Sequence, residues 1–149
     1  MVPILKNYNA KRSTALKKLA LITPKLGRSY PQARNFDRGP GCHTNVSTLS
    51  PWIRHRLLLE EEVVNKVIRA HGFITVEKFV QEMFWRTYWK GWLEMHPEVW
   101  RNFKSTCADK LHAWQDDNEF KKALAGKTGI KCFDHWIAEL RETHYLHNH

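Results

Sequence analysis

The residues best suited to chemistry lie in the segment Phe79–Trp92, where six aromatic residues are interleaved with charged ones. Glu82, Arg86 and Lys90 recur there at every fourth position. At about 100° per residue in a helix, Glu82 and Arg86 share a face with two tryptophans. A surface that combines tryptophan with an acid and a base is typical of a pocket or groove. Such a face could hold the polar edge of a flat ligand.

The alternative for these charges is a simple one. Glu82 and Arg86 are four residues apart, the spacing of an ordinary helical salt bridge. On the same helix a second stripe is apolar and is predicted to face a core. The expected core residues are Val76, Phe79, Val80, Met83, Phe84 and Thr87.

A second candidate for ligand contact is the hydroxyl-bearing loop Ser47-Thr48-Leu49-Ser50, which leads to Pro51 and a predicted short helix. Hydroxyls and backbone N–H groups at such a turn can donate hydrogen bonds to phosphate oxygens. A helix cap is the alternative role for these side chains.

Helical periodicity recurs along the chain, and no segment alternates as a strand does. The sequence therefore predicts an all-α protein of one domain. We expect the aromatic helix to be capped by Thr75 and to end near Met95, with a short turn at residues 98–104. The other expected helices are Asn9–Leu21, Glu60–Ala70, Asp109–Ala125 and Ile130–Thr143, the last with Phe133, Trp136, Ile137 and Leu140 inward.

The net charge of +9 is concentrated near the N-terminus. Residues 1–36 contain eight lysines or arginines and no acid, so residues 1–29 are predicted to form a basic helical arm. Such an arm favours polyanions such as nucleic acid. A solvated helix face and an organelle transit peptide are the alternatives.

Other sites find little support. Cys42, Cys107 and Cys132 form no CxxC pair, which favours small buried thiols in a reducing, cytoplasmic setting. His147 and its neighbouring histidines lack a further ligand at metal spacing, so no metal site is predicted. No apolar run is long enough to span a membrane. Gly126-Lys-Thr lacks the upstream glycine of a P-loop.

Five motifs, in order, resemble the FAD-binding domain of the DNA photolyase and cryptochrome family. They are Tyr30-Pro-Gln-Ala-Arg34, Ser47-Thr-Leu-Ser-Pro51, Glu82-Met-Phe-Trp-Arg86 with Tyr88 and Trp89, Gly126-Lys-Thr-Gly129, and Tyr145-Leu-His-Asn148. The runs Arg34-Asn-Phe-Asp37 and Trp85-Arg-Thr-Tyr-Trp-Lys-Gly-Trp92 look like the bacterial cryptochrome-like branch.

The resemblance implies a role for each matching position. The expected FAD contacts are Tyr30, Ser47, Thr48, Leu49, Ser50, Glu82, Arg86 and Asn148. Trp85 matches the aromatic residue at the opening where a flipped pyrimidine lesion enters, and Trp89 and Lys90 are further candidates for DNA contact. Trp114 corresponds loosely to the outermost tryptophan of an electron-transfer chain.

The departures from the family are equally informative. No α/β antenna domain is apparent, and the family's flavin domain continues past the Asn148 motif. The chain is therefore expected to be the N-terminal part of that domain, with a C-terminal half required for a complete site. The resemblance implies light-dependent electron transfer from FAD to pyrimidine lesions in DNA, or blue-light sensing, in a complete member. The alternative is a non-catalytic, basic helical nucleic-acid-binding module or an inactive fragment.

Overall fold

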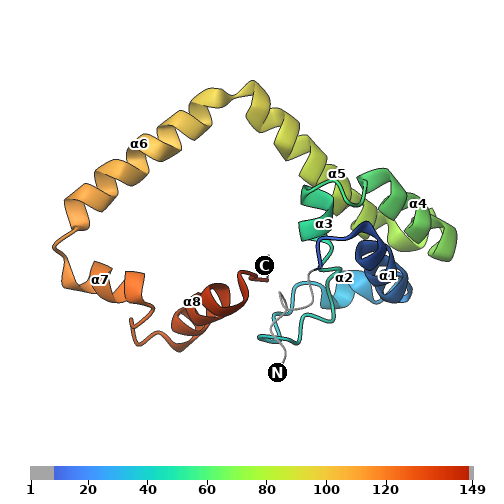
Figure 1. The fold of residues 1–149 in the computed structure, drawn as a ribbon, viewed down its shortest axis with the longest axis horizontal. Coiled ribbons are helices and arrows are strands. Elements are labelled where there is room, and N and C mark those ends of the chain that lie inside the picture. The colour runs from blue at the N-terminus through green and yellow to red at the C-terminus, as the bar shows by residue number, and fades with distance from the viewer. Residues whose placement is uncertain (1–8, 148–149) are drawn as a thin grey trace. The chain divides into compact units, whose positions relative to one another are not determined.

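The computed structural model describes residues 9–147 of the chain, and within that range it contains helices and turns but no strand. The all-α prediction is confirmed. Figure 1 follows the helices in chain order. They are α1 (Arg12–Ile22), the 3-10 turn η2 (Thr23–Lys25), α2 (Tyr30–Ala33), α3 (Ser50–Arg54), α4 (Glu60–His71), α5 (Phe73–Met95), α6 (Pro97–Trp114), α7 (Asn118–Ala125) and α8 (Lys131–Thr143).

The chain divides into two compact units. In the described part, unit 1 comprises residues 9–86 and 147, and unit 2 comprises residues 87–146. The boundary falls within α5, so residues 73–86 of the aromatic helix belong to unit 1 and residues 87–95 to unit 2. None of the helices described is both long and apolar enough to cross a bilayer.

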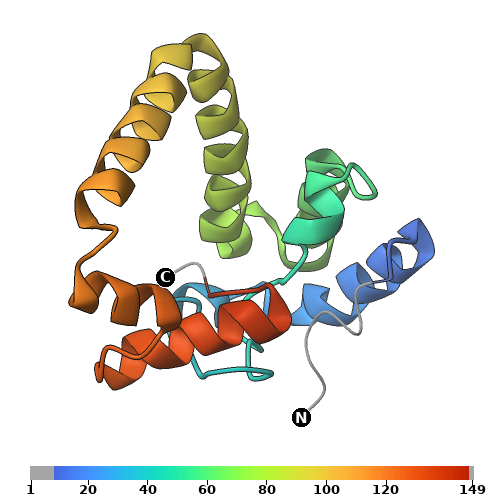
Figure 2. The same ribbon diagram turned by 60° about the vertical axis from the view of Figure 1, so that its left-hand side comes forward.

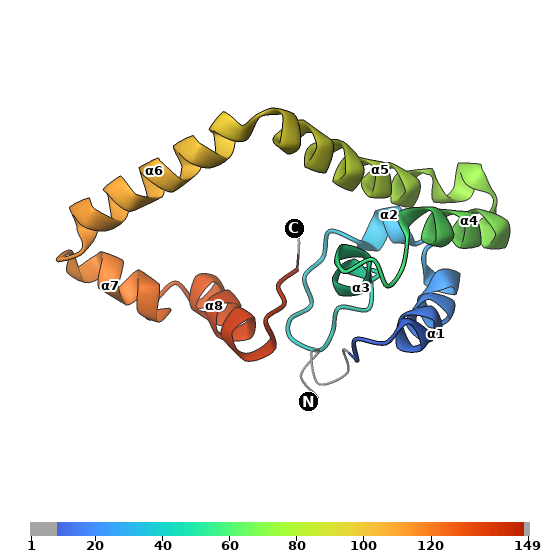
Figure 3. The same ribbon diagram turned by 45° about the horizontal axis from the view of Figure 1, so that its top comes forward.

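Unit 1 holds the hydrophobic core of the described chain. Most core side chains come from α1, α3, α4 and the first part of α5, which Figure 3 shows, and Tyr30 of α2 and Leu49 also belong to the core. Leu19 of α1, Val63 and Val67 of α4 and Val76 of α5 are each exposed by 1% or less. Helix α1 is thus anchored by its apolar face, and its basic residues Arg12 and Lys17 are exposed. Burial of this size is what stabilises short helices that would be marginal in isolation.

The start of α4 is fixed by one carboxylate. Glu62 accepts a hydrogen bond from the backbone N–H of Leu59 at 2.9 Å, and both its oxygens are bound by the Arg12 guanidinium of α1. The N–H groups of a first helical turn otherwise lack partners, and a carboxylate there also suits the helix dipole. Glu62 therefore caps α4 and joins it to α1.

Unit 2 consists of the second half of α5, then α6, α7 and α8. Helix α6 is described throughout and has no buried side chain. Figure 2 shows α7 and α8 as successive helices joined by a short turn. The turn is held by Asp134, which accepts hydrogen bonds from the N–H groups of Thr128 and Gly129, both at 2.9 Å. Gly126 ends α7 at a φ of +67°, and a Cβ there would lie 2.8 Å from Ile137.

Several expected elements are confirmed. Helix α4 begins at Glu60 as predicted and is followed by Gly72; the aromatic helix ends at Met95; and a short helix includes Pro51. Three boundaries were wrong. The predicted helix Asp109–Ala125 is interrupted at residues 115–117, where Asp117 accepts a hydrogen bond from the Phe120 N–H and caps α7. Helix α5 starts at Phe73, which leaves Thr75 inside the helix instead of at its cap. Helix α6 is continuous from Pro97 because proline is well tolerated in the first turn of a helix.

The predicted core stripe of α5 is correct only in its first half. Val76, Phe79, Val80 and Met83 are buried, but Phe84 is 66% exposed and Thr87 is exposed, because the core of unit 1 ends at Met83. In α8, the expected inward residues Phe133, Trp136 and Leu140 are also exposed. Cys42 and Cys132 are exposed and not buried, and Cys107 is half-buried.

Truncation of Leu19 should destabilise unit 1 by about 2–5 kcal/mol, because Leu19→Ala leaves a cavity in a packed core. Leu21 lies on the same helix and is 72% exposed, so Leu21→Ala is a matched control with an expected change within about 0.5 kcal/mol. Urea unfolding followed by circular dichroism measures both values. Equal midpoints for the two variants would contradict the placement of α1 in the core.

The stability of the chain should also depend on the ionisation of Glu62. The Arg12 guanidinium and the Leu59 N–H lower the pKa of Glu62 to about 2. A carboxyl group whose pKa is lower in the folded than in the unfolded state stabilises the fold above its unfolded pKa of about 4.3, and this contribution is lost as the pH falls toward 2. Thermal unfolding between pH 6 and pH 2 should therefore show a smaller pH dependence for Glu62→Gln than for the wild type.

Glu61→Gln is the matched control, since Glu61 is the exposed neighbour in the same helical turn. This variant should keep the pH dependence of the wild type. Identical acid transitions for Glu62→Gln and the wild type would show that the pairing with Arg12 does not stabilise the fold.

Candidate functional site

The most developed polar cluster in unit 1 is built around Glu82. The Tyr30 hydroxyl of α2 donates a hydrogen bond of 2.5 Å to one Glu82 oxygen, and the Arg34 guanidinium binds the other. The Tyr30 ring is 5% exposed and packs edge-on against Phe79 at a centroid distance of 5.3 Å. Two predicted site residues, Tyr30 and Glu82, are therefore in direct contact although 52 positions separate them.

Arg86 belongs to a different ion pair. Its guanidinium lies 2.5 Å from a carboxylate oxygen of Glu60 at the start of α4, and Arg56 binds the other Glu60 oxygen at 3.1 Å. The Glu82 carboxylate faces Tyr30 and Arg34, so the helical Glu82–Arg86 salt bridge considered as an alternative is not formed. Glu82 instead connects α5 to Tyr30 and Arg34, and Arg86 connects α5 to the start of α4.

Three residues of these clusters were not predicted as site residues, namely Arg34, Arg56 and Glu60. Arg34 follows Tyr30 by four positions, so the helical turn at α2 places both on one side, and this spacing was a signal available in the sequence. Glu60 gave no such signal, because an acid in the first turn of a helix is fully explained by the helix dipole.

The hydroxyl loop lies between the core and the surface. Leu49 is completely buried, and Thr48 is 7% exposed with a φ of +50° and donates its hydroxyl to the Ser47 carbonyl at 2.8 Å. Ser47 is half-buried, and Ser50 is exposed at the first residue of α3. No side chain caps α3, so the helix-cap alternative is not supported. Ser47 and Ser50 are the hydroxyls of this loop that remain accessible to a ligand.

Exposed aromatic residues lie in both parts of α5. Trp85 is 54% exposed in unit 1. In unit 2, Trp89 is 50% exposed and contacts Trp92 edge-on at 5.6 Å between ring centroids, and Trp92 stacks on His96 at 4.1 Å. Exposed indole faces of this kind can stack on nucleic-acid bases. Lys90 is exposed on the same helix.

The remaining predicted residues lie elsewhere. Trp114, at the end of α6, is 48% exposed, with the Lys110 ammonium 5.3 Å from its ring centroid. Asn148 lies outside the described residues. Its neighbour His147 is 7% exposed and stacks on His43 at 5.7 Å between ring centroids, both in unit 1.

The residues described offer donors suited to parts of FAD. Accessible hydroxyls on the Ser47–Ser50 loop match the hydrogen-bond acceptors of a diphosphate and a ribityl chain. The Glu82 carboxylate is a strong acceptor for N–H or O–H groups, and it is held in place by Tyr30 and Arg34. This donor and acceptor set fits the cofactor that the motifs imply.

Comparison with known proteins supports a photolyase-like relationship and nothing finer. The chain is 26% identical over 127 residues to the deoxyribodipyrimidine photo-lyase of Vibrio cholerae serotype O1. The match covers 81% of this chain and 26% of that protein, so the chain spans about a quarter of the length of the curated relative that it matches. No family model matches the chain. No solved structure matches it either.

Removal of the Tyr30 hydroxyl should weaken the tie between α2 and α5. Tyr30→Phe keeps the ring against Phe79 but leaves one Glu82 oxygen without its donor, and this should cost roughly 1–2 kcal/mol. Urea unfolding measures the loss. A midpoint equal to that of the wild type would show that the hydrogen bond makes no net contribution.

Proposed function

We propose that this chain is a photolyase-like flavin-binding protein that contacts FAD through the Ser47–Ser50 loop and Glu82. The observation that carries the proposal is the direct contact between Tyr30 and Glu82, two residues of separate motifs that resemble FAD-binding positions of one family. The similarity to a curated photo-lyase is consistent with this function.

Each residue has a distinct part in the proposed binding. The Ser47 and Ser50 hydroxyls donate hydrogen bonds to the phosphates and the ribityl chain, and the backbone of Leu49 lines the loop while its side chain stays in the core. Glu82 accepts hydrogen bonds from the flavin. Tyr30 and Arg34 position Glu82, because they fix both of its oxygens.

When bound, FAD supplies the electron-transfer chemistry, and the protein supplies orientation and electrostatics. Arg34 binds one Glu82 oxygen and offsets the negative charge of the carboxylate. Arg86 acts through Glu60, which ties α4 to α5 and keeps the polar face of α5 in place. We propose that Asn148 approaches the flavin ring and that Trp114 takes part in electron transfer.

We propose DNA as the partner of the aromatic surface of α5. Trp85 and Trp89 present exposed indole rings, and Lys90 adds a positive charge for the phosphate backbone. Light-dependent repair of pyrimidine lesions and blue-light sensing are the two functions that this combination supports. A non-catalytic nucleic-acid-binding module is the second candidate, which the basic composition of unit 1 favours.

Flavin binding is tested by titrating the purified chain with FAD and following flavin fluorescence and absorbance. The wild type should bind saturably. Glu82→Gln should weaken binding by about tenfold, because a charge-assisted hydrogen bond contributes about 1.5–3 kcal/mol and a tenfold change is about 1.4 kcal/mol.

Glu77→Gln is the matched control, since Glu77 is an exposed acid on the same helix whose carboxylate accepts from the Gln81 side chain. Its FAD affinity should equal that of the wild type. If both variants lost affinity equally, Glu82 would have no specific role; if the wild type bound no FAD, the non-catalytic module would be the better account.

A further inference from the structure

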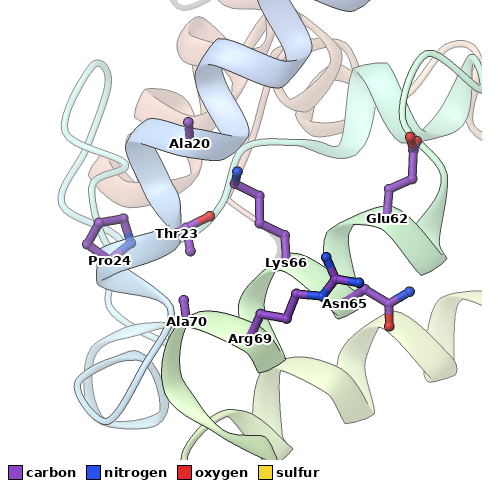
Figure 4. A pocket seen from close by; sticks show the side chains of 8 residues that line it. All are labelled: Ala20, Thr23, Pro24, Glu62, Asn65, Lys66, Arg69 and Ala70. Atoms are coloured by element: carbon purple, nitrogen blue, oxygen red, sulfur yellow. The ribbon is translucent and has the colours of Figure 1, made fainter.

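A groove in unit 1 lies apart from the residues proposed to contact FAD. It runs between α1 with η2 on one side and α4 on the other, and it has a volume of about 670 Å³ (Figure 4). Ala20 and Ala70 contribute small side chains to its lining. Asn65, Lys66 and Arg69 line it from α4. None of these five residues has a role in the proposed flavin site.

Two contacts join α4 to the facing wall of the groove. At one end Arg12 of α1 binds Glu62 of α4, with Nη1 at 3.0 Å from Oε2. At the other end a hydrogen bond of 2.8 Å joins His71 Nε2 to the Thr23 carbonyl. A Cβ at Gly27 would lie 2.8 Å from His71 Nδ1, so glycine permits this close approach. These contacts hold the two walls of the groove next to each other without a ligand.

The charge of the groove is uncompensated. Within the described part of the chain, neither Lys66 nor Arg69 has an ion-pair partner, and the acid among the lining residues, Glu62, is neutralised by Arg12. Lys25 of η2 adds to the field. Partial burial, followed by the charge of Lys25, lowers the pKa of Lys18 on α1. Residues 1–86 carry fifteen lysines or arginines against six acids, whereas residues 87–146 carry nine of each.

We propose that this groove binds the phosphodiester backbone of DNA through Lys66 and Arg69. This proposal rests on the proposed function, which identifies the polyanion as DNA. It adds a second contact surface for DNA, besides α5. A guanidinium and an ammonium on neighbouring turns of α4 can each meet a phosphate, and the Asn65 amide offers another donor. A recessed groove admits an extended backbone strand, whereas a flat bilayer surface cannot enter it. The contact carries no sequence preference, because the phosphates are the same at every step.

The test compares two double variants that lose the same net charge from the same unit. Lys66→Gln/Arg69→Gln changes the groove, and Arg54→Gln/Lys78→Gln changes two exposed cations that do not line it. Binding of each protein to a fluorescein-labelled duplex of mixed sequence is followed by anisotropy over a range of NaCl concentrations. The groove variant should bind more weakly, and the slope of log K against log salt should be smaller by about 1.8, since each phosphate contact contributes about 0.9.

The single variant Lys66→Gln should reduce the slope by about 0.9, and circular dichroism establishes that each variant is folded. Equal losses in the groove variant and the control would overturn the proposal, because they would reflect net charge alone. The proposal would also be overturned if the wild-type chain bound vesicles containing phosphatidylserine but did not bind the duplex. FAD affinity should be unchanged in the groove variant. A chain that binds DNA in this way but takes up no FAD would refute the flavin proposal and leave the groove standing.

Discussion

The interaction on which unit 1 depends most is the placement of one carboxylate, Glu82, between a phenol and a guanidinium. Glu82 lies on α5, whose apolar face at Phe79 and Met83 is part of the core. Because the helix is fixed by that burial, the carboxylate has a fixed position toward Tyr30 and Arg34. A half-buried carboxylate is stable only if its oxygens are satisfied, so α2 must lie against α5. The segment from Gly27 to Leu49 is thereby held against α5 near its start, at Tyr30 and Arg34.

The same logic holds for the other charged pairs of unit 1. Glu60 joins Arg86, and Glu62 joins Arg12, so the acidic first turn of α4 is linked to α5 and to α1. Acids in the first turn of a helix also suit the helix dipole. The structure shows that two of them also connect helices. Among the described residues, no acid forms an ion pair with Lys66 or Arg69, and both line the groove between α1 and α4.

Local sequence patterns predicted the presence of most helices, but they could not predict contacts between residues far apart in the sequence. The start of α4 at Glu60, the end of α5 at Met95 and the short helix at Pro51 follow from signals within a few residues. The burial of Phe84 was predicted wrongly, because periodicity gives the direction of a side chain but not the point at which a core ends. The contact of Tyr30 with Glu82 spans 52 positions, and no local rule relates them. Only the order of the motifs, compared with a family, suggested that they belong to one site.

The central claim is that FAD contacts this chain at the Ser47–Ser50 loop and at Glu82. The most direct measurement is a map of backbone amide chemical shifts, recorded by nuclear magnetic resonance on the ¹⁵N-labelled chain with and without FAD. We expect the largest changes at Ser47, Ser50 and Glu82, with small changes along α7 and α8. Changes confined to the basic residues of α1 and α4, or no changes at all, would contradict the claim.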